Sequence, residues 1–534
     1  MSNIFKPRSV YIAASWMAPV GKYNGSDKEN MSFLEMAECC GNIFDGSPVR
    51  RREIEAVVVG SQNPAAFSGV DNTAAKIAGI LEISGARSVL VDTASSSGAS
   101  AFESAYLEVA SGRFDHVLAV GIQKMSDAST SESTRIIAGV IDRHESEYGL
   151  TMPACGALVA RALKERLGLN EEEWVAYSGL LTQRSQRYAA RNPDAHLNYK
   201  IELDDYYRQI ANNKNYLYWD PLRYHDFCPM SDGMASIILT SKPQDVLVSG
   251  VGSATDIPTI ADRNYFHSFP ATVTAAGYAY GMAGIKNIRS FAGNLHVNMH
   301  DPFNGFGPIN LVDLGIVSSS RLMDALLDEN LTGENGEFPT NLTGGLKGRG
   351  HPLGATGMIQ IVENHWLIRE RGFAAALSHS IGGPINNNVV TLLERSEHYH
   401  SRQHNRFKPW GMPSLGKLKP KGVTLDALLS SGRVLEGSFV TSTARFNYKN
   451  GRPEVVVLII SCRHEGGTHK FLFGVEGEHY SQISTFKPGD NVAVERINGA
   501  IHVNSIPIRK FYERTVNGLV ELAGNSWKKI VSKK

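Results

Sequence analysis

Residues 350–357 of this 534-residue chain read Gly350-His351-Pro352-Leu353-Gly354-Ala355-Thr356-Gly357. Glycine and alanine at this density allow two backbone segments to approach closely. Pro352 suits the first turn of a helix, where an amide hydrogen is not needed. His351 is therefore predicted at a loop tip directly before a helix. One histidine in such a position is more often structural than catalytic.

A second histidine is predicted at a comparable place. Residues 294–300 have the apolar pattern of a strand, and the chain continues as His300-Asp301-Pro302-Phe303. A histidine at a strand end, followed by Asp-Pro, is well placed to face a cleft. Two such histidines favour an acid–base or anion-stabilising site.

A third segment combines a strand, a turn of small residues and the start of a helix. It reads Val91-Asp92-Thr93-Ala94-Ser95-Ser96-Ser97-Gly98-Ala99. Such a turn exposes one side chain and directs backbone amides at a developing anion. A nucleophile elbow uses the same geometry, although its Gly-x-Ser-x-Gly pattern is absent here. Taken alone, the run fits an ordinary serine N-cap equally well.

Strands and helices alternate around these segments. Short apolar runs at residues 55–60, 88–92 and 116–121 are separated by stretches with helical spacing, and the pattern restarts after residue 245. Uninterrupted apolar strands with amphipathic helices between them indicate an α/β fold whose parallel sheet is covered on both faces. Residues 148–232 are rich in helix formers and arginine, which predicts an excursion that caps the site.

The C-terminal part has a different character. Residues 396–422 are polar, with prolines and three histidines but no further ligands at metal spacing, so a linker and no metal site are predicted. Beyond residue 432, five short strands and Asn-Gly turns at 450–451 and 498–499 predict a small all-β, OB-like barrel.

The predicted domains follow from these changes of pattern. They are an N-terminal half at 1–240 with a loop domain at about 127–230, a C-terminal half at 241–396, a linker at 397–430, and a β-barrel with a basic tail at 431–534.

Composition limits the classes of partner. Lysine and arginine number 54 against 53 aspartate and glutamate, and the net charge of +1 gives no long-range attraction to nucleic acid or anionic membranes. The barrel lacks aromatic residues interleaved with basic ones, which base stacking needs. The longest apolar run, Val455–Ile460, is too short for a bilayer, and five scattered cysteines form no disulfide framework. We expect a cytoplasmic protein without membrane partners. Composition disfavours nucleic acid as a partner, and binding of nucleic acid by the barrel is kept as a third, weaker alternative.

Over about residues 5–396 these segments resemble the thiolase superfamily. The block 350–357 matches that family's signature letter for letter, and His300-Asp301-Pro302-Phe303 is similar to the His-Asp-x-Phe block of the sterol-carrier-protein-type branch. The resemblance implies a thiolase fold of two similar five-stranded α/β halves packed face to face, with a loop domain that helps to bind coenzyme A. With its additional C-terminal domain, the chain specifically resembles the type-1 thiolase-like proteins.

The resemblance breaks at the thiols. The family's acylated cysteine falls on Ser95, its acid–base cysteine falls on Ser380, and the branch's His-Asp-Cys-Phe cysteine falls on Pro302. A thiol is partly ionised near neutral pH, whereas a serine hydroxyl needs a base to take its proton during attack. We therefore do not expect this chain to be an efficient thiolase.

The resemblance still implies an acyl-CoA thioester as substrate, with no permanently bound cofactor. His351 is implied as the base. His300 and the backbone amides of Ser95 and Gly382 are implied as oxyanion donors, and Ser95 and Ser380 as the catalytic positions that lost their thiols. The glycines implied to border the thioester are Gly350, Gly354, Gly382 and Gly383.

Two classes of function stay open from the sequence. The first is an enzyme of lipid metabolism, either an acyltransferase related to acetyl-CoA acetyltransferase or a catalyst of C–C bond chemistry on a CoA thioester. The second is a non-catalytic acyl-CoA binder or scaffold whose C-terminal barrel docks a partner. A homodimer and a monomer are both compatible with the sequence.

Overall fold

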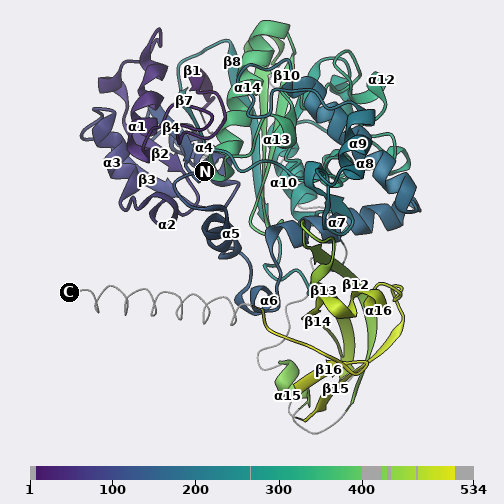
Figure 1. Cartoon of the computed structure of the whole chain (residues 1–534). Helices are drawn as coiled ribbons and strands as arrows, with labels where there is room; N and C mark the ends of the chain where they lie inside the picture. Colours follow the sequence, from purple (N-terminus) through teal and green to yellow (C-terminus); the bar gives the residue numbers. More distant parts are fainter. Residues whose placement is uncertain are drawn as a thin grey trace, which may run out of the picture.

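The computed structural model describes residues 8–264, 266–399, 424–429, 434–464, 467–498 and 500–511. Among these residues, nine strands form one mixed sheet in the order β3-β2-β4-β7-β1-β8-β11-β10-β9 (Figure 1). Their bounds are β1 Tyr11–Met17, β2 Ala56–Gly60, β3 Arg87–Val91, β4 His116–Gln123, β7 Gly233–Thr240, β8 Val246–Thr255, β9 Leu295–Asn298, β10 Ala375–Gly382 and β11 Asn387–Arg395.

The sheet consists of two halves with the same arrangement. In the first half β2 is parallel to β3 and β4, and β7 runs antiparallel between β4 and β1. In the second half β9 is parallel to β10, and β11 runs antiparallel between β10 and β8. The register pair Tyr11–Leu247 joins the halves. The predicted α/β fold of two similar halves is confirmed.

The second half differs from the expectation of five strands. At the place equivalent to β3, Val297 of β9 forms only an isolated parallel bridge with Thr340. Pro339 has no amide hydrogen to extend a ladder, and Asn341 takes a left-handed conformation at φ +51. The chain therefore turns away from the sheet after one bridge, which leaves four strands in the described residues of this half.

Two helices lie between the halves and start at the same end of the molecule. They are α4 (Ser97–Ala110) and α14 (Thr356–Arg371), and their apolar side chains share one cluster with strands of both halves. The helices approach closely because the second residue of each is glycine: a Cβ on Gly357 would lie 2.7 Å from the Ala99 nitrogen. This central layer makes the two halves of the sheet face each other across α4 and α14.

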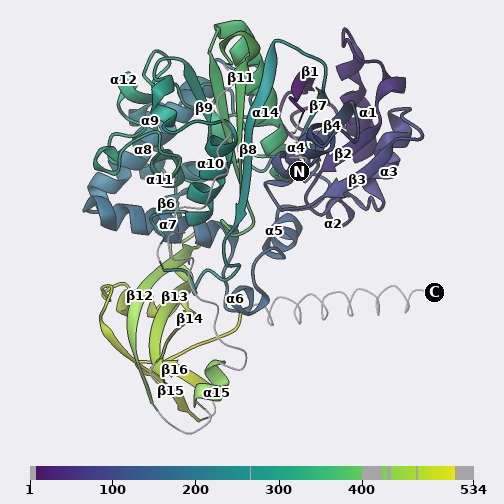
Figure 2. The same cartoon turned by 180° about the vertical axis from the view of Figure 1, so that it is seen from behind.

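Other helices cover the outer faces. The helices α1 (Phe33–Cys39) and α3 (Thr73–Ile80) pack on the first half, and α10 (Pro270–Met282) and α11 (Phe306–Asp313) pack on the second. Figure 2 shows α10 and α11 from behind. Shorter helices are α2 (Pro64–Ser68), α12 (Glu329–Thr332) and α13 (Gly345–Gly348).

The excursion between β4 and β7 is mostly helical, as predicted. It contains α5 (Thr130–Ala138), α6 (Arg143–Glu147), α7 (Met152–Leu167), α8 (Glu171–Ala189), α9 (Leu203–Ala211), β5 (Leu217–Trp219) and β6 (Leu222–Arg223). Although it arises from the first half, it packs on the second. Gly156 of α7 lies against Phe303, where a Cβ would stand 2.4 Å from the ring, and Gly348 of α13 lies against α8.

The C-terminal strands form a separate antiparallel sheet in the order β14-β13-β12-β15-β16-β17. Their bounds are β12 Leu435–Phe446, β13 Pro453–His464, β14 Gly467–Glu476, β15 Asn491–Ile497, β16 Ala500–Val503 and β17 Ile506–Pro507, with α15 Leu425–Leu429 and α16 Tyr480–Ile483 beside them. The sheet closes into a barrel where the Arg509 amide, which follows β17, donates to the carbonyl of Gly474 in β14 at 2.8 Å. This order and closure are OB-like.

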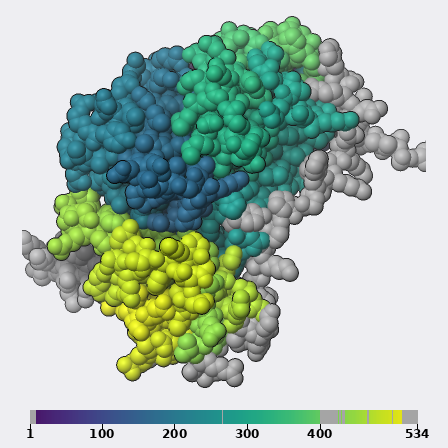
Figure 3. All heavy atoms as spheres, turned by 90° about the vertical axis from the view of Figure 1, so that its right-hand side faces the viewer, coloured from purple at the N-terminus to yellow at the C-terminus, as the bar shows by residue number. Residues whose placement is uncertain are grey.

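The barrel rests on the helical excursion rather than standing apart (Figure 3). Val457 and Ile459 of β13 belong to the same apolar cluster as Leu158 and Trp174 of the excursion. Trp219 of β5 pairs with Arg445 of β12, so the two segments share a sheet. Most of the predicted linker and the basic tail lie outside the described residues. No helix in the described ranges has the length and hydrophobicity needed to cross a membrane.

Candidate active site

Three of the predicted site segments meet at one end of the central helix layer. His300 follows β9, and Ser380 lies on the parallel neighbour β10, whose register pairs Ser378 with Asn298. Two residues beyond that pair, Ser380 and His300 lie at the same edge of the sheet. The first turn of α14 begins there too, since a Cβ on Gly357 would lie 3.0 Å from the Ser380 hydroxyl.

The turn that carries Ser95 is held by a network of hydroxyls. Ala94 takes the left-handed conformation at φ +57. The Thr93 hydroxyl bonds to the hydroxyls of Ser96 and Ser100, at 2.8 Å each, and the Ser97 hydroxyl donates to the Ala94 carbonyl at 2.5 Å. By contrast, the half-buried Ser95 hydroxyl makes no hydrogen bond within the described part of the chain. It is the hydroxyl of this turn that is free for a ligand.

Gly382 brings the end of β10 against this turn. A Cβ there would lie 2.0 Å from the Thr93 carbonyl oxygen and 2.4 Å from the Ser96 hydroxyl, so only glycine fits. The adjacent Gly383 has φ +59, which also favours glycine. These contacts place the Ser380–Gly383 segment and the Ser95 turn side by side.

The two glycines of the histidine block pack against protein atoms. A Cβ on Gly350 would meet Val20 at 2.6 Å, and one on Gly354 would meet the Gln62 nitrogen at 2.5 Å. Both positions serve close backbone packing around the site. Their predicted contact with a thioester stays a prediction.

The structure brings the two predicted histidines into contact. The rings of His300 and His351 lie edge to face, with centroids 5.0 Å apart and planes at 86°. Both residues are buried, at 3% and 6% exposed. The His351 Nδ1 shares a hydrogen bond of 2.8 Å with the Thr356 hydroxyl, and the Asn310 amide donates to the His300 carbonyl at 2.6 Å. The loops that carry the rings are therefore held in place.

Both imidazoles are neutral at pH 7. Burial, and to a smaller extent the nearby Arg349 charge, lowers the pKa of His351 to about 3. Burial also holds the pKa of His300 well below its usual range, with smaller effects from His351, His379 and Arg349. A neutral imidazole donates through one nitrogen and accepts through the other. The pair can therefore supply one acceptor and one donor to the same ligand.

Among the residues that the structure describes, no carboxylate is hydrogen-bonded to either imidazole, as a Ser-His-Asp arrangement would require. The partner of His351 Nδ1 is a hydroxyl, and Asp301, next to His300, accepts from the Leu346 amide at 2.8 Å instead. Without a carboxylate, an imidazolium formed by deprotonating Ser95 gains no ionic stabilisation. Activation of Ser95 as a nucleophile is therefore weakly supported by this geometry.

Several residues near the site were not predicted. Thr356 lies inside the quoted glycine-rich block, five residues after His351. Its hydrogen bond to the His351 ring could therefore have been predicted from the spacing of the two residues. Cys228 was not among the predicted site residues, yet its amide donates to the Pro302 carbonyl at 2.8 Å. Burial raises the pKa of this thiol to about 12, so it stays protonated at neutral pH and does not replace the missing cysteines.

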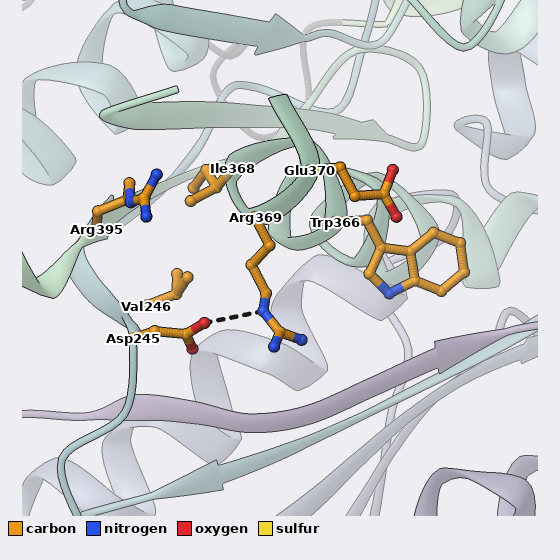
Figure 4. A pocket seen from close by; sticks show the side chains of 7 residues that line it. All are labelled: Asp245, Val246, Trp366, Ile368, Arg369, Glu370 and Arg395. Atoms are coloured by element: carbon orange, nitrogen blue, oxygen red, sulfur yellow. Dashed lines mark hydrogen bonds and ion pairs between the residues drawn. The ribbon is translucent and has the colours of Figure 1, made fainter. Parts of the chain in front are cut away.

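A surface cavity of about 380 Å³ lies elsewhere (Figure 4). Its lining residues are Asp245, Val246, Trp366, Ile368, Arg369, Glu370 and Arg395. Arg369 stands 13 residues along α14 from Thr356, a rise of about 20 Å. The Arg369–Asp245 ion pair at 2.8 Å is exposed, and such pairs contribute little. None of the predicted site residues lines this cavity.

Comparison with known proteins identifies the family. The profile described as "Thiolase, N-terminal domain" matches residues 10–199, and "Thiolase C-terminal domain-like" matches residues 252–395. Acetyl-CoA acetyltransferase of Methanothermobacter thermautotrophicus is 30% identical over 385 residues, covering 68% of this chain and 95% of that protein. Sterol carrier protein 2 of Gallus gallus is 28% identical over 312 residues, covering 53% of this chain and 54% of that protein.

A solved structure extends the likeness of fold to the C-terminal region. The monomeric SCP2-thiolase like protein type 1 of Mycobacterium smegmatis superposes with a TM-score of 0.66 at 17% identity, covering 93% of this chain and 99% of that one. The two sequence profiles, the relatives and the arrangement of strands agree. The chain is a member of the thiolase superfamily, in its sterol-carrier-protein-2 branch.

Proposed function

We propose that this protein cleaves or forms a C–C bond in a CoA thioester by aldol chemistry, without an acyl-enzyme. The observation that carries the proposal is the pair of buried imidazoles in edge-to-face contact, at the end of the molecule where β10 meets the Ser95 turn. A thiolase needs a thiolate, which this site lacks. Aldol chemistry needs only one acceptor for a proton and donors for an enolate oxygen.

In the cleavage direction the substrate is a 3-hydroxyacyl-CoA. The Nε2 of His351 accepts the proton of the 3-hydroxyl when its Nδ1–H donates to Thr356. The Cα–Cβ bond breaks, its electron pair passes into the thioester as an enolate, and the former alcohol carbon becomes a carbonyl. His300 and the backbone amides of Ser95 and Gly382 donate to the enolate oxygen. The proton held by His351 then returns to Cα, which gives a shorter acyl-CoA and an aldehyde or ketone.

The low pKa of His351 means that the imidazolium formed in this sequence must be short-lived. A buried imidazole beside Arg349 is a poor resting place for a proton. In aldol cleavage the proton is taken as the C–C bond breaks and is returned in the same turnover, so no stable imidazolium is required. The Ser95 and Ser380 hydroxyls then act as hydrogen-bond donors to the thioester.

Nucleic acid is a weaker candidate for the barrel. OB folds bind oligonucleotides on the face of their second and third strands. Here the corresponding strands, β13 and β14, contribute Val455, Val457, Ile459 and Leu472 to the cluster shared with the helical excursion. That burial supports a docking role within the chain.

The test is turnover of a panel of 3-hydroxyacyl-CoA thioesters, with the carbonyl product trapped as a hydrazone and the shorter acyl-CoA separated by chromatography. We expect turnover by the native protein, a loss of about 10²-fold or more in H300A and H351A, and at most about a tenfold loss in S95A. Intact-mass measurement should show no acyl adduct.

Two results would overturn the proposal. An acyl adduct on Ser95, with activity abolished in S95A, would establish an acyltransferase. Calorimetric binding of acyl-CoA that persists in H351A, without turnover of any thioester, would establish the non-catalytic binder.

A further inference from the structure

A buried ion pair, Arg349–Glu363, links the segments that carry the two histidines. The proposed aldol reaction gives this pair no role. Arg349 is 0% exposed and Glu363 of α14 is 3% exposed, and Arg349 Nη1 lies 3.4 Å from Glu363 Oε2. Removing two charges from water costs about as much as their attraction returns, so such a pair seldom stabilises a fold more than apolar residues would. Its presence calls for a role other than stability.

The pair connects the two histidine segments. Arg349 precedes His351 by two residues. The same Glu363 oxygen that faces Arg349 accepts a hydrogen bond of 2.7 Å from the Asn298 amide, and Asn298 precedes His300 by two residues. Glu363 is therefore bonded at once to the segment of each imidazole.

The backbone at Arg349 is also held on both sides. Its amide donates to the Gly345 carbonyl at 2.9 Å, and its carbonyl accepts from the His196 amide at 2.8 Å. The guanidinium thus projects from a fixed point toward α14. A change in the length or shape of this side chain must shift either Glu363 or the His351 loop.

Several polar atoms around the pair have no partner in the described part of the chain. They are Nε and Nη2 of Arg349, Oε1 of Glu363, Oε1 of Gln360 and Nδ1 of His300. Buried polar atoms are almost always hydrogen-bonded, so each exception calls for an explanation. This set of exceptions includes a ring nitrogen of the imidazole pair itself.

The charge of Arg349 acts on the same rings. Around His300 the titratable and charged groups with a resolved effect are His351, His379 and Arg349, and around His351 the group is Arg349. In each case burial is the larger cause and the guanidinium adds to it. Burial is therefore the main reason that both rings stay unprotonated, and the group that fixes their loops adds a smaller effect in the same direction.

We propose that Arg349, paired with Glu363, is a positioning residue that fixes the mutual arrangement of the His300 and His351 imidazoles. The role in catalysis rests on the proposed function of this histidine pair. The arrangement of the two imidazoles does not rest on the proposed function, so it can be measured without any turnover of substrate.

The test combines histidine NMR with kinetics on the full chain. Protein labelled with ¹³C at histidine Cε1 is titrated with acid, and the two signals are assigned with H300Q and H351Q. In R349Q/E363Q, where no unpaired charge is left, both signals should shift and their titration midpoints should rise. With an active 3-hydroxyacyl-CoA, kcat should fall about tenfold or more while KM changes less than about threefold.

The matched control is R184Q. Arg184 is another buried arginine, at 7% exposed, whose guanidinium donates to the carbonyls of Thr332 and Thr340. R184Q should lower the melting temperature and leave both histidine signals in place. If R349Q/E363Q does not fold, R349K supplies the test, because lysine keeps the charge but not the planar fork; it should shift the signals while leaving the midpoints low.

Unchanged histidine signals and midpoints in the folded R349 variants would overturn the proposal. This result is separable from a failure of the proposed function, in which the native protein turns over no thioester but the signals still respond to Arg349.

Discussion

Replacing Gly382 by alanine tests whether the end of β10 and the Ser95 turn touch as described. The new methyl group would lie 2.0 Å from the Thr93 carbonyl oxygen and 2.4 Å from the Ser96 hydroxyl. The hydroxyl can rotate away, but the carbonyl belongs to the backbone of a turn fixed by hydrogen bonds. Overpacking of this kind costs about 1–3 kcal/mol, and we place G382A at the upper end because the obstacle is backbone.

Gly79 provides a matched control. It lies in α3, a Cβ there would meet nothing within 4 Å, and it has no left-handed φ. G79A should therefore stabilise by about 0.5–1 kcal/mol through helix propensity. The two variants are compared by thermal melting with and without CoA.

We expect the melting temperature to fall in G382A and to rise slightly in G79A, and CoA should stabilise G382A less than the native protein. The reasoning would be refuted if G382A melted at the native temperature and kept the full stabilisation by CoA. In that case the two segments would not be in contact in solution.

Three further predictions concern the histidine site and the barrel. Burial lowers the pKa of His351 to about 3, whereas the same imidazole in the unfolded chain has a pKa near 6.5. Between these two pH values only the unfolded chain binds a proton at His351. The free energy of unfolding therefore decreases as the pH falls from about 6.5 toward 3, by up to about 1.4 kcal/mol per pH unit. H351Q should flatten melting temperature against pH in this window; a slope equal to the native one would contradict this. T356V removes the partner of His351 Nδ1 and should lower turnover about tenfold, with recovery in T356S; equal losses in both would exclude a role for the hydroxyl. Y480F removes a hydrogen bond of 3.0 Å to Asp220 and should weaken docking of the barrel by about 1 kcal/mol, seen as faster proteolysis at the junction. Unaltered cleavage would show that this contact does not hold the barrel.

Local pattern was sufficient for much of the fold. The apolar runs that predicted strands at 55–60, 88–92 and 116–121 correspond to β2, β3 and β4. Strand β7 was not predicted, although Gly233–Thr240 is buried throughout. The second half has no fifth strand among the described residues because Pro339 and the left-handed Asn341 flank Thr340. This could not be predicted from the sequence, since it depends on knowing that Thr340 faces Val297 of β9.

For the candidate site, too, some features were predictable from the sequence and others required the structure. His300, His351 and the turn that carries Ser95 were identified from residue type and local pattern, since turns and helix starts have short-range signatures. Ser380 came from the resemblance to the thiolase family. Their relation in space was not accessible from such signatures. That Ser95 alone keeps a free hydroxyl depends on how Thr93, Ser96 and Ser97 satisfy one another in the folded turn.

Residue order therefore specified the two α/β halves and the barrel, because periodicity and motif identity are properties of neighbouring positions. The neutral state of the imidazoles, the Arg349–Glu363 link and the seating of the barrel on the helical excursion came from folding alone. Each arises from burial and from contacts between residues far apart along the chain, and neither burial nor distance is written in a local pattern.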